Sequence, residues 1–128
     1  MRIGVTGSRS WPASKNQVIE RVLLQEYVAG MREIVHGGSS SVDRAADLAM
    51  RRYGWTDNEI NVTRRDLVLA SDKLVAFWDG KSKGTEDCIK RALRLELPVD
   101  TYLLKADGTV VLTSTVAPQK PEDPYSDD

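Results

Sequence analysis

The stretch Ile34-Val35-His36-Gly37-Gly38-Ser39-Ser40-Ser41-Val42-Asp43 decides how the chain is expected to fold. Apolar residues run into two glycines and three hydroxyl residues, and an amphipathic segment follows over 44–53, which predicts a strand, a tight loop and a helix. Such a loop directs unpaired backbone N–H groups and the positive end of a helix dipole toward one point, which suits a phosphate. Gly37 and Gly38 allow backbone angles closed to other residues and have no Cβ to hold a ligand away. A tight connection without any ligand is the alternative.

The composition is that of one globular domain. The chain has 128 residues, of which 41% are hydrophobic and 29% charged, enough to bury a core without cross-links. A net charge of −1 provides no global attraction for nucleic acid or an anionic membrane. Apolar runs are too short to span a membrane and no signal-peptide pattern is present, so we expect a cytoplasmic protein. With one cysteine (Cys88) and one histidine (His36), we expect no intrachain disulfide and no metal site.

Apolar periodicity and turn residues divide the chain into alternating strands and helices. Strands are expected at residues 2–6, 34–36, 73–77, 99–104 and 109–113, with a vestigial strand at 60–62. Helices are expected at residues 14–30, 44–53, 63–70 and 86–95. This order indicates an α/β fold, namely a single Rossmann-like, three-layer domain over residues 1–116 whose mostly parallel sheet has helices on both faces.

The C-terminal part of the chain departs from the alternation. The pair Asp107-Gly108 between two apolar runs is a two-residue hairpin signal, which predicts an antiparallel pair at one edge of the sheet. Residues 117–128 hold three prolines and four acidic residues, and we expect them to form a disordered tail.

Three loops are expected to meet at one edge of the sheet. In open parallel sheets a ligand binds beyond the carboxyl ends of the strands, at the point where the strand order reverses. The loops at 6–9, 36–43 and 77–85 all follow strands and all contain glycine and hydroxyl residues. Arg64, from the segment before the 73–77 strand, is expected to reach the same edge. The predicted ligand-binding residues are Gly7, Ser8, Arg9, Gly37, Gly38, Ser39, Ser40, Asp43, Arg64, Trp78, Asp79, Ser82, Gly84 and Thr85.

Most of these residues have a structural interpretation beside the functional one. Arg9 can pair with a phosphate or lie in solvent, and Arg64 can reach the site or form surface pairs. Asp43 suits a ribose hydroxyl or a helix cap equally, because a carboxylate next to phosphate would repel it. Asp79 is a candidate for a sugar hydroxyl or an acid, although Asp79-Gly80 is also a common turn pair.

The aromatic and capping residues also have both a structural and a functional interpretation. Trp78, more than Trp11, could stack on a base, or both could cover the edge of the core. N-caps are expected at Ser14 (with Gln17), at one of the serines 39–41, at Thr63 (with Asp66) and at Thr85. For His36 and Cys88, structural roles are favoured over acid–base and nucleophilic ones.

These residues together resemble a known superfamily. The segments Val5-Thr6-Gly7-Ser8-Arg9, His36-Gly37-Gly38 with Asp43, Arg64, and Ser82-Lys83-Gly84-Thr85 are similar, in order and spacing, to the SLOG (SMF/DprA–LOG) proteins, nearest the short bacterial and phage YspA-like members. The similarity covers residues 2–104. It implies a Rossmann-like domain that binds a nucleotide or a derivative such as a nucleoside monophosphate, ADP-ribose or an NAD relative, and it implies a homodimer.

The sequence also departs from the family pattern. Ser41 stands where related proteins usually have glycine, and the segment between Gly54 and Arg64 is short. The LOG-type phosphoribohydrolases of the superfamily carry a catalytic glutamate at the position of Cys88. Asp87 and Glu86 lie beside it, but on a helix they point roughly 100° and 200° away, respectively.

Three functions follow, in order of preference. The first is binding of a nucleotide derivative as a sensor or sequestering module, with no other cofactor. The second is hydrolysis of an N-glycosidic or phosphate bond, with Asp79, Asp43 or Glu86 as the acid or base, and the missing carboxylate at Cys88 disfavours it. The third is binding of single-stranded DNA as in DprA, which the near-neutral charge disfavours.

Overall fold

The computed structural model describes residues 1–115, and the expected tail at 117–128 lies outside them. Six strands form one sheet in the order β3-β2-β1-β4-β5-β6. The strands are β1 (Arg2–Gly7), β2 (Glu33–His36), β3 (Ile60–Val62), β4 (Lys73–Trp78), β5 (Val99–Leu104) and β6 (Val110–Thr115). The helices are the 3-10 turn η1 (Ala13–Lys15), α1 (Asn16–Val28), α2 (Ser41–Arg52) and α3 (Lys83–Arg94).

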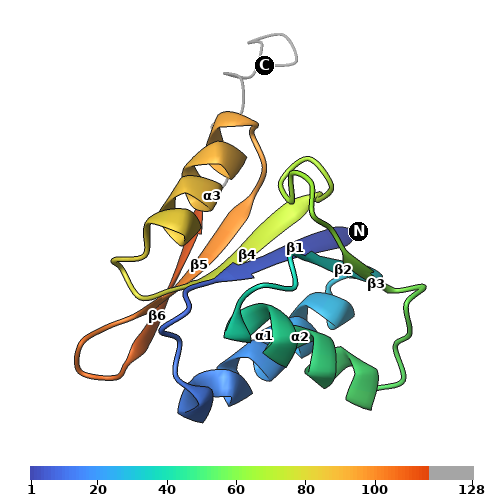
Figure 1. The fold of residues 1–128 in the computed structure, drawn as a ribbon, viewed down its shortest axis with the longest axis horizontal. Helices are drawn as coiled ribbons and strands as arrows, with labels where there is room; N and C mark the ends of the chain where they lie inside the picture. Colours follow the sequence, from blue (N-terminus) through green and yellow to red (C-terminus); the bar gives the residue numbers. More distant parts are fainter. Residues whose placement is uncertain (116–128) are drawn as a thin grey trace, which may run out of the picture.

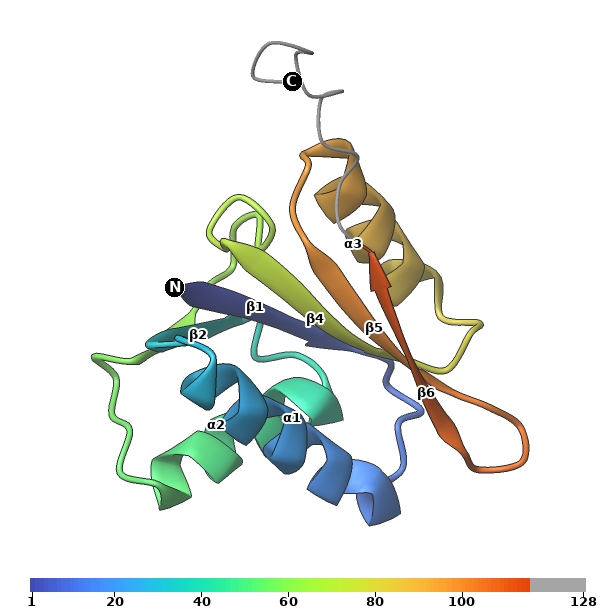
Figure 2. The ribbon, with the colours of Figure 1, turned by 180° about the vertical axis from the view of Figure 1, so that it is seen from behind.

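The predicted α/β fold class is confirmed. All neighbouring strands are parallel except β5 and β6, which form the antiparallel C-terminal hairpin at one edge. Helices α1 and α2 pack together on one face of the sheet and α3 packs on the other (Figures 1 and 2). The chain therefore forms a Rossmann-like domain in three layers, and the strand order reverses between β1 and β4.

The two faces of the sheet have separate apolar clusters. Strand β4 is central, and its residues Leu74 to Phe77 are fully buried because helices cover both of its faces. On the α1/α2 face the ring of Phe77 stacks on Tyr102 and meets the edge of Trp11. On the α3 face Val68, Leu74, Ala92 and Val99 form a smaller cluster. Trp11 therefore belongs to the core and is not placed to stack on a ligand.

The vestigial strand expected at 60–62 is confirmed as β3, whereas the helix expected at 63–70 is wrong. In its place, the segment forms turns in which Asp66 accepts hydrogen bonds from the N–H groups of Val68 and Leu69. The other oxygen of Asp66 pairs with Arg91 of α3. This ion pair connects the irregular segment to α3.

Two other local predictions change in detail. Ser14 does not cap a helix, because it lies within η1 and neither η1 nor α1 has a side-chain cap. The hairpin connection is longer than two residues: the Gly108 N–H bonds to the Lys105 oxygen, and Gly108 has a φ of +88° that closes the turn. Within residues 1–115, no helix combines the length and the apolar character needed to cross a membrane.

Candidate functional site

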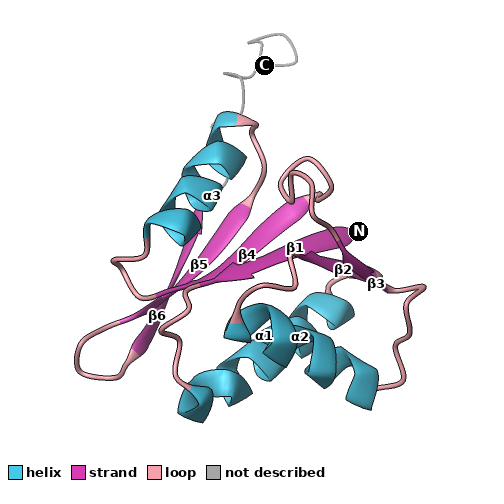
Figure 3. Ribbon diagram, viewed as in Figure 1, coloured by secondary structure: helices cyan, strands magenta, loops and turns pink. Residues whose placement is uncertain are grey.

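A pocket of about 360 Å³ opens where the strand order reverses. The loop after β1, the start of α2 and the start of α3 contribute its lining residues. Figure 3 shows the loops that leave this edge of the sheet. The lining residues are Thr6, Gly7, Ser8, Arg9, Ser39, Ser40, Ser82, Gly84 and Thr85. The three loops thus surround one space.

The floor of the pocket is a pair of buried hydroxyl groups. Ser8 is 1% exposed and Thr85 4%, and their oxygens lie 3.4 Å apart. The Ser8 hydroxyl also accepts the N–H of Asp79 at 3.1 Å. Either hydroxyl can be the donor in the Ser8–Thr85 pair, so one of the two protons is free for a group in the pocket. The floor can therefore donate a hydrogen bond to a bound acceptor.

The start of α2 is held by its own polar groups. Ser40 is the N-cap, and its hydroxyl oxygen accepts the Asp43 N–H at 3.0 Å. One oxygen of the buried Asp43 carboxylate accepts the Ser39 N–H at 3.3 Å, while the other has no partner among the described residues. This carboxylate does not line the pocket. It orders the loop by accepting the Ser39 N–H.

The start of α3 is held from β4. The Asp79 carboxylate accepts the N–H groups of Lys81 and Ser82 at 2.8 and 2.7 Å, and it also accepts the hydroxyl groups of Ser10 and Ser82. Burial alone would raise the pKa of Asp79, but the hydrogen bonds from Ser10, Ser82 and Lys81 outweigh it and hold the pKa well below its usual range. Asp79 is thus an ionised turn residue, and Ser82, not Thr85, stands at the N-cap of α3.

The structure brings eight of the fourteen predicted ligand-binding residues into the pocket lining. Gly37 and Gly38 shape the loop from outside the pocket, and a Cβ at Gly38 would meet Val62, not a ligand. The Trp78 indole N–H donates to the Ser82 oxygen, and Arg64 is exposed beyond β3. Together with Asp43 and Asp79, these four residues make up the six predicted residues that lie outside the pocket lining.

Arg9 is the one charged residue among those that line the pocket. It is exposed, and no carboxylate in residues 1–115 forms an ion pair with it. The helix starts at Ser41 and Lys83 add the positive ends of two helix dipoles. The electrostatics of the pocket therefore favour an anion.

The acid–base candidates Asp43, Asp79 and Glu86 lie outside the pocket lining. No aspartate or glutamate is among the described residues that line the pocket, and Glu86 lies within 3.5 Å of Lys90 on the surface of α3. Burial raises the pKa of the Cys88 thiol, and its hydrogen bond with Thr6 offsets this only in part. A thiol in this state is a poor nucleophile.

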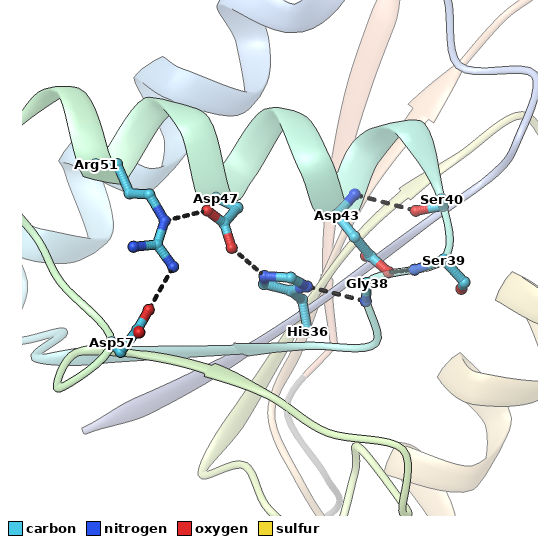
Figure 4. Close-up of polar contacts among 8 residues, drawn as sticks. All are labelled: His36, Gly38, Ser39, Ser40, Asp43, Asp47, Arg51 and Asp57. Carbon is cyan, nitrogen blue, oxygen red and sulfur yellow. Dashed lines mark hydrogen bonds and ion pairs between the residues drawn. The ribbon is translucent and has the colours of Figure 1, made fainter.

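Two features were missed from the sequence. Thr6, the residue before Gly7 at the end of β1, lines the pocket, although the sequence indicated it only as part of the 6–9 loop and not as a ligand-binding residue. The second is a chain of polar contacts from His36 through Asp47 and Arg51 to Asp57 (Figure 4). An acidic and a basic residue four apart on a helix are too common to have indicated it.

No cluster of histidine, cysteine or carboxylate side chains that could hold a metal ion occurs in the described part of the chain. Comparison with protein-family models, with curated proteins and with solved structures finds no match to this chain.

Proposed function

We propose that the chain binds a nucleotide or nucleotide derivative, such as a nucleoside monophosphate, ADP-ribose or an NAD-like molecule, and acts as a sensor or sequestering module. One observation carries the proposal: two helix starts, a hydroxyl floor and the cation Arg9 surround a single pocket at the reversal of strand order. The resemblance to SLOG proteins supports the same class of ligand.

The pocket offers different chemistry for the phosphate and for the sugar. Gly84 has open space where a Cβ would stand, so a phosphate can approach the N–H groups of the first turn of α3. Arg9 adds a charged donor for the same group. On the other wall, the hydroxyl groups of Ser39 and Ser40 suit a ribose or the edge of a base.

Binding without turnover is the preferred form of this function. Cleavage of a glycosidic bond requires a carboxylate beside an oxocarbenium-like transition state. None lines the pocket in the part of the chain that the structure describes, and Cys88 occupies the place of the LOG-type glutamate. Hydrolysis is the second candidate, and binding of single-stranded DNA is the third.

Thermal unfolding with and without AMP, NAD or ADP-ribose tests the proposal. A ligand present at about 100 times its Kd stabilises the folded state by about 2.7 kcal/mol, which corresponds to a rise in Tm of about 10 °C for a domain of this size. Chromatography of the same mixtures reports turnover. Release of a free base or ribose phosphate would show an enzyme, and no Tm shift with any of the three would contradict the proposal.

Substitution at Gly38 tests the placement of the site. Gly38 has a φ of +72°, and a side chain there would press on Val62 at 3.1 Å, so Gly38→Asp distorts the loop that carries Ser39 and Ser40. We expect the ligand-induced Tm shift to disappear while the fold persists. Gly108→Asp, in the β5–β6 turn with a similar φ of +88°, is the matched control and should keep the shift. An unchanged shift in Gly38→Asp would place the site elsewhere.

The homodimer and the cytoplasmic location both stay predictions. Light scattering during size-exclusion chromatography distinguishes a monomer of 14.2 kDa from a dimer.

A further inference from the structure

A buried histidine lies behind the loop that carries Ser39 and Ser40 into the pocket. His36 ends β2 and is 3% exposed. Its Nε2 atom lies 2.7 Å from an oxygen of Asp47 on α2, and its Nδ1 atom accepts the N–H of Gly38 at 3.0 Å (Figure 4). Both ring nitrogens are therefore used, one toward the helix and one toward the loop.

These contacts define which nitrogen carries the proton. An atom that accepts an N–H must present a lone pair, so Nδ1 is unprotonated and the ring hydrogen is on Nε2. That hydrogen is donated to Asp47, whose other oxygen accepts the Arg51 Nε–H at 2.6 Å. Arg51 in turn binds Asp57 at 2.7 Å. Asp47 is thus an oriented carboxylate that selects one tautomer of His36.

The hydrogen bond between the imidazole of His36 and the Gly38 N–H is the contact that bears on the pocket. Gly38 turns the chain at a positive φ, and the next residues are held by the Ser39 N–H to Asp43 and by the Ser40 cap. The His36–Gly38 bond is the contact that connects this loop to the end of β2. A lone pair at Nδ1 therefore holds Gly38, the residue that directly precedes Ser39 and Ser40 of the pocket wall.

We infer that His36 and Asp47 are positioning residues of the candidate pocket: Asp47 holds His36 as the neutral tautomer that accepts the Gly38 N–H, and this bond sets the wall formed by Ser39 and Ser40. The inference rests on the proposed function. It adds that binding in the pocket requires a hydrogen-bond acceptor at the position of the His36 Nδ1 atom.

The groups around the ring show that His36 is the acceptor for the Gly38 N–H. Helix α2 presents Asp47 and Arg44 to the hollow beside His36, and β3 presents Val62. The carboxylate of the loop, Asp43, faces the Ser39 N–H. The Gly38 N–H therefore depends on the lone pair of the His36 Nδ1 atom.

Three variants separate positioning from general stability. His36→Leu removes the acceptor and leaves the Gly38 N–H unpaired, while His36→Asn keeps an oxygen at the same distance along the side chain and does not titrate. Glu20→Gln weakens the exposed contacts of Glu20 with Arg52 and Tyr53 and is the matched control. Binding of ADP-ribose to each protein is measured by calorimetry at pH 7.5.

We expect His36→Leu to weaken ADP-ribose binding by at least tenfold at pH 7.5, and His36→Asn by no more than about threefold. Glu20→Gln should bind as tightly as the wild type. Equal affinity of His36→Leu and wild type, or a loss in His36→Asn as large as the loss in His36→Leu, would overturn the inference. If His36→Leu does not fold, His36→Asn and the exchange of the Gly38 amide in the wild type decide.

A measurement on the ligand-free protein separates this inference from the proposed function. Long-range ¹H–¹⁵N correlation spectra identify the protonated ring nitrogen, and amide hydrogen exchange reports the Gly38 N–H. We expect the proton on Nε2 and a protected Gly38 amide whose exchange accelerates at least tenfold in His36→Leu, after correction for pH. A proton on Nδ1, or an unprotected Gly38 amide, would overturn the inference, whereas absence of ADP-ribose binding with these features intact would count against the proposed function for that ligand alone.

Discussion

The two helices that begin at the pocket are held in opposite ways. The start of α2 is closed by its own sequence, because Ser40 caps the Asp43 N–H and the Asp43 carboxylate takes the Ser39 N–H. The start of α3 is held from outside, because Asp79 at the end of β4 takes the Ser82 N–H and hydroxyl. The first turn of α3 itself carries Gly84, with open space around it.

This difference assigns the two walls of the pocket different tasks under the proposed function. At α2 the buried Asp43 carboxylate repels an anion, and the helix packs tightly on β1, since a Cβ at Gly7 would lie 2.4–2.6 Å from the Val42 side chain. At α3 the backbone is accessible and no carboxylate lines the wall in the described chain. Under the proposed function we therefore expect α2 to set the shape of the pocket and α3 to bind the anionic group.

The largest effect is expected where α2 meets β1. Gly7→Ala places a methyl group against Val42 at distances that no packed core tolerates, and we expect the free energy of unfolding to fall by about 1 to 3 kcal/mol. Urea denaturation measures the loss. The double variant Gly7→Ala/Val42→Ala should recover part of it, because the second change removes the opposing atoms. A loss below about 0.5 kcal/mol in Gly7→Ala would show that the contact is not tight.

An intermediate effect is expected from Asp79, which holds α3. Its folded-state pKa is lower than that of the unfolded chain, so its contribution is complete above about pH 5 and is lost as the pH falls from about 4 toward 2. We expect Asp79→Asn to cost about 1 kcal/mol at pH 6, the net worth of a typical hydrogen bond, and to flatten the acid limb of the stability curve. Urea denaturation at pH 6 and pH 3 measures both, and parallel acid limbs in the two proteins would contradict the assignment.

The smallest effect on stability is expected at Gly84. Alanine in the first turn of α3 has open space and a higher helix propensity, so Gly84→Ala should raise the free energy of unfolding by no more than about 1 kcal/mol. The methyl group would stand where a phosphate approaches the backbone, and we expect the affinity for AMP or ADP-ribose to fall severalfold. Thermal unfolding with and without ligand measures both. Unchanged affinity would show that the anion does not bind at the first turn of α3.

The sequence was informative where a signal is local. Apolar residues followed by glycine and hydroxyl residues correctly predicted connections after β1, β2 and β4, and the parallel alternation placed them at one edge. The third connection is shorter than expected, because α3 begins at Lys83 and includes Gly84 and Thr85. The Ser40 cap also follows from nearby residues. Such signals depend on backbone chemistry within a few positions, and tertiary contacts left them unchanged.

Contacts between distant residues were beyond the same reasoning. The helix expected at 63–70 does not form, because Asp66 pairs with Arg91, 25 residues later, and its other oxygen closes a turn. Thr85 does not cap α3, because its hydroxyl is buried against Ser8 from the other end of the chain. Each difference comes from a partner that no periodicity reveals.

The most direct test is a calorimetric titration of AMP, NAD and ADP-ribose into the wild type and into Arg9→Gln. Arg9 is the one cation among the residues that line the pocket, and removing a hydrogen-bonded charge costs about 1.5 to 3 kcal/mol, or roughly 10- to 150-fold in affinity. We predict that at least one of the three binds the wild type and binds Arg9→Gln at least tenfold more weakly. Absence of binding by all three, or equal affinity in both proteins, would contradict a nucleotide site at this edge of the sheet.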